Sequence, residues 1–313
     1  MKVNSIFHVH TFRCGHAPDM TDEECVKIAI SHNAKKIYFS DHCPFPDDAF
    51  GARMKYTMLD DYIENLLSLK EKYKDFIRIY IGLETEYFKK YEKDGYYKKL
   101  KSDNRIDFLL LGQHMAEMSD GQYTFSLKDK SDEYKYLGDA ICEGLESGYF
   151  NYLAHPDRIF RYNNSWDDDK EKIADTIKCI ALKSNVCLEK NLSSIRKNVY
   201  YKQFWENLPY GSQIVIGFDA HSLSDIDAGV AFLKNAFIKG NEIYSYNQIP
   251  KYSSEKLKQV RKKIKMSQKN FSEYLGISSK TLETWEQEKT DIPLPICRLL
   301  EMIEGNSNVT YIY

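Results

Sequence analysis

Residues 6–16 have the sequence IFHVHTFRCGH, an apolar run with histidines at positions 8 and 10 and a third at position 16. On a β-strand, residues i and i+2 project to the same face, so His8 and His10 are expected to point the same way from the strand end. The chain after Thr11 must then loop to bring His16 near them. Neutral imidazole is the commonest metal ligand, so this stretch predicts part of a metal site. The alternative is a surface strand with solvated histidines.

Short apolar runs alternate with amphipathic helical stretches as far as about residue 240. The expected strands cover residues 5–9, 36–42, 77–84, 108–114, 152–155, 186–189 and 213–221, and the expected helices cover 21–33, 59–73, 134–147 and 169–184. This alternation predicts a parallel sheet. About seven such units favour a β/α barrel over an open sheet, and a β/α barrel collects its site at the C-terminal ends of its strands.

Nearly every expected strand ends in a histidine or a carboxylate. Ten such residues lie at or just past strand ends: His8, His10, His16, Asp41, His42, Glu84, His114, His155, Asp219 and His221. Nitrogen and oxygen donors without a thiolate cluster suit zinc, manganese or iron. The set exceeds what one tetrahedral ion can use, so two or three divalent ions joined by a carboxylate are predicted. Two ions about 3.5–4 Å apart can activate a water and clamp a phosphate ester.

Six motifs in fixed order carry a family resemblance: H-x-H-T-x-x-x-C-x-H, S-D-H, G-x-E, G-Q-H, A-H-P-D and D-A-H. Together they resemble the PHP (polymerase and histidinol phosphatase) family over roughly residues 1–240. The resemblance implies an α/β fold, a distorted seven-stranded (β/α)7 TIM-like barrel with a trinuclear metal centre. It places one metal on His8, His10, Glu84 and Asp219, a second on Glu84, His114 and His155, and a third on His16, His42 and His221. Asp41 is expected to orient a ligand imidazole.

Chain size and motif order are most similar to the histidinol phosphatase branch. The resemblance therefore implies hydrolysis of L-histidinol phosphate to L-histidinol and phosphate, by attack of a metal-bridging hydroxide. Asp41 and a metal-bound water are the two candidates for the acid. Arg158 follows A-H-P-D, and Arg196 lies in an N-x-S-x-x-R-K stretch. A guanidinium can bind phosphate bidentately, whereas the alternative for each arginine is a surface ion pair. Glu117 and Phe45 are candidates for holding the ammonium and imidazole of the substrate.

The composition of the sequence and its pattern of apolar residues change past residue 240. Residues 241–254 are polar and tyrosine-rich and are expected to form a linker, and residues 255–313 a small all-α domain. Ser267 and Ser278 are good N-caps for two short helices, with Gly276 at the turn between them. The pattern resembles the Cro/C1-type (XRE-like) helix-turn-helix, which implies that the second helix enters the major groove of DNA. The implied DNA-facing residues are Gln268, Ser279, Lys280 and Thr284.

The alternative for this tail is a small helical bundle used for protein contact or dimerisation. Because repressor-like modules often pair, a homodimer is a further expectation. Two further functions stay open. One is a DNA-binding regulator whose barrel senses or slowly hydrolyses a phosphorylated metabolite, and the other is a PHP-type nucleotide or nucleic-acid phosphoesterase.

Bulk composition limits the other classes of protein. The formal net charge of −2 argues against a protein that coats nucleic acid. No signal peptide is expected in the first residues, because histidines come before any apolar segment could form. No apolar run approaches the ~18 residues that span a bilayer, so no membrane partner is expected. Seven cysteines at irregular spacing favour a reducing cytoplasm over a disulfide framework.

Overall fold

The computed structural model describes residues 3–163, 165–209, 211–239, 252–293, 296, 297, 300, 311 and 312. The chain divides into two compact units. The barrel unit takes in Met1–Trp205, Ser212–Gly240 and Thr310–Tyr313, and the C-terminal unit takes in Glu206–Gly211 and Asn241–Val309. The expected linker at residues 241–254 lies mostly outside the described residues.

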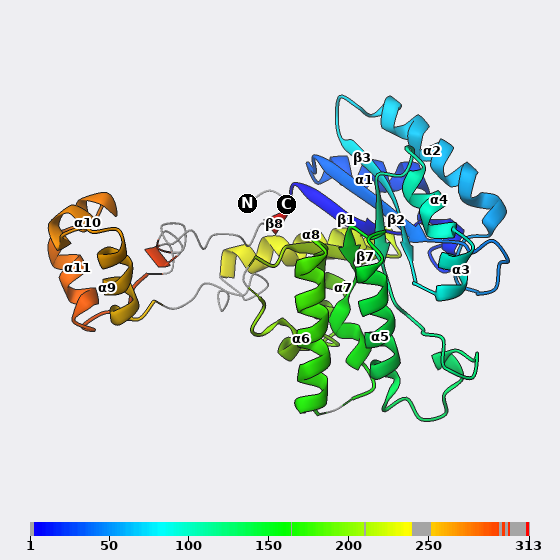
Figure 1. The fold of residues 1–313 in the computed structure, drawn as a ribbon. Coiled ribbons are helices and arrows are strands. Elements are labelled where there is room, and N and C mark those ends of the chain that lie inside the picture. Colours follow the sequence, from blue (N-terminus) through cyan, green and yellow to red (C-terminus); the bar gives the residue numbers. More distant parts are fainter. Residues whose placement is uncertain are drawn as a thin grey trace. The chain divides into compact units, whose positions relative to one another are not determined.

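Seven parallel strands form the barrel (Figure 1). They are β1 (Ser5–Val9), β2 (Lys36–His42), β3 (Arg78–Thr85), β4 (Phe108–Leu111), β5 (Tyr152–Leu153), β6 (Cys187–Asn191) and β7 (Ile214–Ala220). Each strand pairs with the next, and β7 pairs back with β1, which closes the sheet. This arrangement confirms the expected seven-stranded β/α barrel. The short strand β8 (Tyr311–Ile312) adds in parallel beside Ile214 and Val215 of β7.

Helices follow most strands of the barrel. They are α1 (Asp22–Ser31), α2 (Leu59–Lys72), α3 (Lys89–Lys93), α4 (Tyr96–Ser102), α5 (Glu133–Glu146), α6 (Asp168–Lys183), α7 (Leu192–Arg196) and α8 (Leu223–Lys239). The sequence predicts α1, α2, α5 and α6 to within two residues at each end. It does not predict α3, α4 and α7, which have only five to seven residues and too few turns to show a helical period, nor the longer α8.

Aromatic rings fill the barrel interior toward the N-terminal ends of the strands. We call this group the aromatic plug; it consists of Phe7, Tyr38, Tyr80, Phe108 and Tyr152. The Phe7 ring centroid lies 4.7 Å from that of Tyr152, and the rings of Tyr38 and Tyr80 stack at 4.3 Å. Along β2 and β3, His42 and Glu84 come four residues after plug residues and therefore project to the same side of the sheet. The plug thus forms the floor beneath the strand ends.

The described part of the C-terminal unit contains three short helices, α9 (Ser254–Lys263), α10 (Gln268–Tyr274) and α11 (Ser279–Glu286). Each begins at a serine whose side chain accepts a hydrogen bond from a backbone N–H of the first turn: Ser253, Ser267 and Ser278. The helices enclose a small core that includes Leu257, Phe271, Leu282 and Trp285. Among the described residues of the whole chain, no helix is long and apolar enough to cross a membrane.

Candidate metal centre

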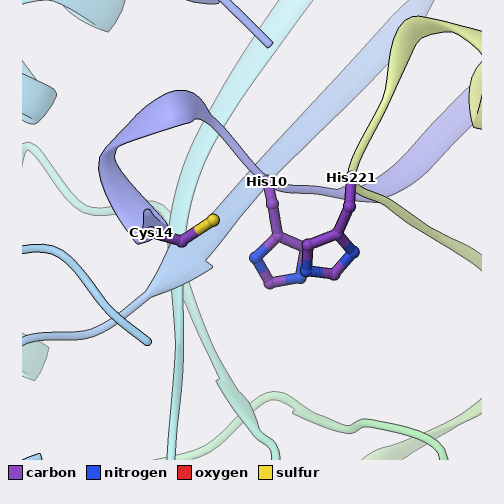
Figure 2. A group of neighbouring side chains, drawn as sticks. All are labelled: His10, Cys14 and His221. Carbon is purple, nitrogen blue, oxygen red and sulfur yellow. The ribbon is translucent and has the colours of Figure 1, made fainter. Parts of the chain in front are cut away.

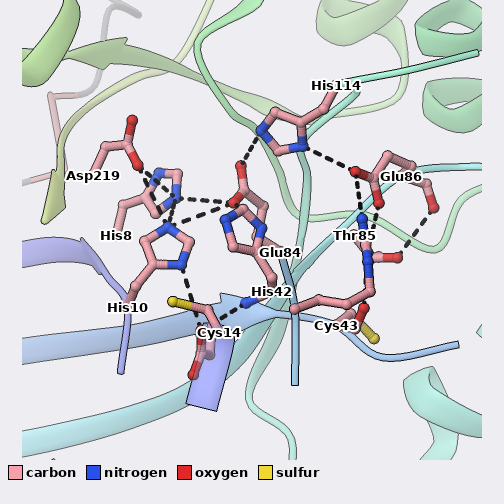
Figure 3. Close-up of polar contacts among 12 residues, drawn as sticks. His8, His10, Cys14, His42, Cys43, Glu84, Thr85, Glu86, His114 and Asp219 are labelled. Carbon is pink, nitrogen blue, oxygen red and sulfur yellow. Dashed lines mark hydrogen bonds and ion pairs between the residues drawn. The ribbon is translucent and has the colours of Figure 1, made fainter. Parts of the chain in front are cut away.

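The structure gathers all nine predicted ligands at the C-terminal ends of the barrel strands. Figure 3 shows His8, His10, His42, Glu84, His114 and Asp219 of this set. Strand β1 and the loop after it supply His8, His10 and His16, β2 and β3 supply His42 and Glu84, the segments after β4 and β5 supply His114 and His155, and β7 and its continuation supply Asp219 and His221. Parallel strands closed into a barrel bring these residues together although they span more than 200 positions of sequence.

Three of these residues have an unusual backbone conformation, which sets the direction of their side chains. His8, His155 and Asp219 adopt positive φ angles of 66°, 30° and 50°. The pairing of β1 with β2 and β7 is irregular between Phe7 and Val9, so His8 sits at a bulge and not on a regular strand. Such conformations cost on the order of 1–3 kcal/mol each in non-glycine residues and cluster at functional sites. The bulge brings Nε2 of His8 to within 2.9 Å of Nε2 of His10.

Glu84 lies between two sets of histidines, and its two oxygens face different sets. Atom Oε2 lies 3.1–3.5 Å from nitrogens of His8, His10 and His42. Atom Oε1 lies 3.0 Å from Nε2 of His155 and 3.6 Å from Nε2 of His114. A carboxylate in this position has the geometry of a bridge between two metal ions.

The donor atoms fall into groups compact enough to hold an ion. The groups are His8 with His10 and Glu84, Glu84 with His114 and His155, and His16 with His42 and His221. The family resemblance implies three groups with these members and adds Asp219 to the first, where Oδ1 of Asp219 lies 3.4 Å from Nε2 of His10. Among the described residues, Glu84 Oε2 and His221 Nε2 are buried atoms without a hydrogen bond. Buried donor atoms without a hydrogen bond, one in the Glu84 groups and one in the His221 group, fit divalent cations.

A fourth group combines His10, Cys14 and His221 (Figure 2). The two imidazole rings stack with centroids 4.1 Å apart, and the Cys14 side chain enters from the short 3-10 helix Phe12–Cys14. Burial and the charge of Asp41 raise the pKa of the Cys14 thiol to about 12. Without a metal the thiol is therefore protonated at neutral pH, and unlike a carboxylate it would have to lose a proton to bind one.

Electrostatics favour the metal-binding forms of three ligands, Glu84, His221 and His42. Burial opposes ionisation of Glu84, but the imidazoles of His8, His114 and His42 hold the pKa of this carboxyl well below its usual range. Burial and the charge of His10 lower the pKa of His221 to about 3. Burial also lowers the pKa of His42 well below its usual value. Metals bind carboxylates and neutral imidazoles, so these residues need lose no proton to bind one.

Asp41 lies behind His10. Its Oδ1 is 3.5 Å from Nδ1 of His10 and accepts a hydrogen bond from the backbone N–H of His42, while Oδ2 accepts one from the hydroxyl of Thr11. These contacts suit the expected orienting role. The side chain is fully buried, so the carboxyl offers no exposed oxygen to a leaving group as the candidate acid.

The two predicted phosphate-binding arginines lie at the edge of the ligand set. Arg158 Nη1 is 3.4 Å from Asp219 Oδ2, and the side chain is about one-third exposed. Arg196 Nη1 is 3.6 Å from Asp225 Oδ1, and the other oxygen of Asp225 accepts a hydrogen bond from the backbone N–H of His221. Each arginine has an acidic partner, but only Arg158 touches a candidate ligand.

The two predicted substrate-binding residues lie elsewhere. Phe45 is fully buried, with its ring stacked on Tyr91 at 4.3 Å and the guanidinium of Arg53 over it at 5.2 Å. It therefore has no exposed face on which a substrate ring could stack. Glu117 is exposed in the loop after β4, where its backbone forms a bridge with Tyr123.

Sequence reasoning missed Glu189 as a functional residue. Its fully buried carboxylate bonds Nδ1 of His8 at 2.8 Å and accepts a hydrogen bond from the backbone N–H of His155 at 3.1 Å. Glu189 thus holds the imidazole ring of His8 and the backbone of His155, which has a positive φ. The available signal was its place at the end of an apolar strand, which it shares with the predicted ligands.

A comparison with known protein families matches the part of the chain that holds most of these residues. The family model described as PHP domain matches residues 7–193, more than half of the 313-residue chain. The chain belongs to the PHP domain family. The matched range of the PHP domain holds seven of the nine candidate ligands, and Asp219 and His221 follow beyond its end.

Several named proteins resemble this PHP domain. A Deinococcus radiodurans protein named "Probable histidinol-phosphatase" is 26% identical over 235 residues, covering 70% of this chain and 86% of the relative. The Bacillus subtilis "Histidinol-phosphatase" is 27% identical over 93 residues, or 28% of this chain and 35% of the relative. The solved histidinol phosphate phosphatase of Lactococcus lactis subsp. lactis, complexed with zinc, L-histidinol and phosphate, has a TM-score of 0.59 at 20% identity and covers 76% of this chain and 94% of its own. The structural likeness supports the barrel fold.

Proposed function

We propose that this protein is a metal-dependent phosphomonoesterase that hydrolyses L-histidinol phosphate to L-histidinol and phosphate. The observation that carries the proposal is the bridging position of Glu84 between two sets of histidines. The names of the relatives, and the ligands of the Lactococcus lactis structure, support the choice of substrate.

Two or three divalent ions would be held by the nine residues gathered at the strand ends, with zinc, manganese or iron as candidates. When bound, such ions lower the pKa of a coordinated water and neutralise charge on phosphoryl oxygens. The protein's own part is to hold the ligands still. Asp41 faces Nδ1 of His10, and Glu189 bonds Nδ1 of His8, so both rings present Nε2 to the centre.

The first test is steady-state phosphate release from L-histidinol phosphate, compared with a panel of sugar and nucleoside monophosphates. With zinc or manganese supplied, we expect a strong preference for L-histidinol phosphate. Chelation should abolish the activity and added metal should restore it. Uniformly slow release across the panel would contradict the proposed substrate.

Arg158 is expected to bind a phosphoryl oxygen of the substrate. Removing a hydrogen bond to a charged group costs about 2 kcal/mol, so Arg158→Ala should lower kcat/KM roughly thirtyfold. Arg158→Lys should recover part of this loss, because lysine keeps the charge but not the planar fork. Arg78→Ala is the matched control, since Arg78 is exposed at the start of β3. Equal kcat/KM in wild type and Arg158→Ala would show that Arg158 serves only its ion pair with Asp219.

We also propose that the C-terminal unit binds duplex DNA as a Cro/C1-type helix-turn-helix, with α11 as the recognition helix. Support comes from the turn between α10 and α11, where Gly276 has φ 67° and Ser278 caps α11. Ser279 and Lys280 are exposed in the first turn of α11. The other two predicted contacts are partly engaged within the unit, because Gln268 donates to Glu286 and Thr284 donates to the carbonyl of Thr281.

DNA binding can be tested with a pool of random-sequence duplexes at several salt concentrations. We expect a bound fraction to be enriched at low salt, with affinity that falls steeply as salt rises. Lys280→Ala should reduce the slope of log affinity against log salt by about one. Lys35→Ala, an exposed change on the barrel, should leave it unchanged. Absence of any bound duplex at low salt would exclude the module as a DNA reader, and cleavage of the duplexes would instead favour the nuclease alternative.

We further propose that the protein works in the cytoplasm and pairs through its C-terminal unit. All seven cysteines lie in the described part of the chain as free thiols, which supports a reducing compartment. Pairing would match the two half-sites that helix-turn-helix dimers contact. Light scattering of the full chain tests it.

A further inference from the structure

Glu86 lies directly behind His114 (Figure 3) and forms a buried ion pair with Arg53. Glu86 follows Glu84 by two residues, just past the end of β3, and is 1% exposed. Its two oxygens accept hydrogen bonds from the two terminal nitrogens of Arg53, at 2.9 and 3.1 Å. The Arg53 side chain is only 5% exposed. This pair is outside the nine predicted ligands, and no role was assigned to it from the sequence.

Glu86 fixes the ring of His114. Atom Oε1 of Glu86 lies 3.0 Å from Nδ1 of His114, and the opposite nitrogen, Nε2, lies 3.6 Å from Oε1 of Glu84. A carboxylate at Nδ1 accepts the ring proton there and leaves the lone pair on Nε2. His114 is therefore held in the tautomer that can donate Nε2 to a cation shared with Glu84.

Arg53 links this arrangement to a second part of the centre. It lies in the segment between β2 and α2, and its Nη1 also donates to the carbonyl of Cys43, the residue after His42. Its guanidinium covers the rings of Phe45 and Phe50 at 5.2 and 5.6 Å. One side chain therefore ties the segment that follows His42 to the carboxylate that orients His114.

The main chain at His114 has a separate support. Arg161 Nη2 donates to the carbonyl of His114 at 3.2 Å. Loss of Glu86 would accordingly free the imidazole ring while the backbone stays in place. A buried ion pair is weak evidence for a role in stability, because the cost of desolvation offsets most of the attraction between the two charges. Fixing the His114 ring in one tautomer, by contrast, requires an ionised carboxylate at this position, here paired with Arg53.

We propose that Glu86 and Arg53 are positioning residues that act through His114 and set the affinity of the metal position formed by Glu84, His114 and His155. The inference rests on the proposed metal-dependent function. The inference says that the Glu86–Arg53 pair sets the affinity for one metal equivalent and leaves the affinity for the others unchanged.

The test uses the full chain, stripped of metal and titrated with zinc against a competing chromophoric chelator. The variants are Glu86→Gln, which keeps the shape but loses the charge, and Arg53→Met, which keeps an apolar stem over Phe45. We expect the affinity of one zinc equivalent to fall by about 10- to 100-fold in each variant, while the other equivalents keep their wild-type affinity. Arg53→Lys should give an intermediate loss, because it retains charge without the fork.

Lys170→Met is the matched control, since Lys170 is a buried lysine on α6 that pairs with Asp167 away from the ligand set. Lys170→Met should change the melting temperature and leave the affinity for every zinc equivalent unchanged. Wild-type affinity for every zinc equivalent in Glu86→Gln or Arg53→Met would overturn the inference and make the pair structural, and so would an equal loss at all equivalents. Should Glu86→Gln not fold, Arg53→Met and Arg53→Lys carry the same test. Zinc affinities are measured without substrate, so a failure to release phosphate from L-histidinol phosphate would reject the proposed function and leave this result readable.

Discussion

Glu84→Ala is expected to lose phosphate release by on the order of 10³-fold or more in kcat/KM, because metal ions supply several kcal/mol of charge stabilisation and each 1.36 kcal/mol is a factor of ten. Glu84 is fully buried between the two histidine sets and faces both with separate oxygens. Its removal should weaken two metal positions together. The neighbouring histidines would then hold metal ions without the carboxylate that balances the charge of those ions.

The measurement is kcat/KM for L-histidinol phosphate together with the number of zinc ions retained after gel filtration. Glu84→Ala should retain fewer ions than wild type as well as lose turnover. Glu71→Ala, an exposed change near the end of α2, serves as the control and should match wild type in both. If Glu84→Ala keeps its full metal content and turnover, Glu84 is no bridge, and the centre must be organised around another carboxylate.

The strands and their ends were predictable because their signal is local. A short apolar run followed by His, Asp or Glu marks both the element and the residue that it delivers, as in β2 with His42 and β3 with Glu84. Closure of the barrel then places all such ends at one mouth, whatever their separation in sequence. The grouping of ligands by metal came from the family resemblance and not from spacing.

Among the residues that support the ligands, Asp41 came from the family resemblance, whereas Glu189 and Glu86 were not predicted, because each pairs with a partner far away in sequence. Glu189 and His8 are separated by 181 positions, and Glu86 and Arg53 by 33. Their contacts depend on which strands face each other across the barrel and on how each side chain turns. The bulge at His8 is likewise invisible in the sequence, because the strand pattern there predicts regular alternation. Phe45 was assigned to the substrate from its motif neighbours, whereas burial in an aromatic cluster depends on α3 and α4, which the sequence analysis did not assign.

Gly217→Ala should lower kcat/KM about 100-fold, although Gly217 is not itself a candidate metal ligand, because loss of a group that orients a ligand costs about 10–100-fold. A Cβ built on Gly217 would lie 1.4 Å from Oε1 and 2.3 Å from Cδ of Glu189. The Glu189 side chain is fully buried and bonds both His8 and the backbone of His155. It can yield space only by giving up those bonds. Overpacking should also cost about 1–3 kcal/mol of stability.

Gly51→Ala is the control for this prediction, since a Cβ there would meet no atom of the described chain within 4 Å. The decisive variant is the double mutant Gly217→Ala with Glu189→Asp, in which the shorter acid makes room for the added methyl group. If the collision with Glu189 is the cause, the two changes compensate, and the double mutant is more active than Gly217→Ala alone. Additive losses would mean that alanine disturbs β7 itself. Compensation would establish that the glycine on β7 is required so that a carboxylate from β6 can reach a histidine on β1, a dependence among three strands that no single motif encodes.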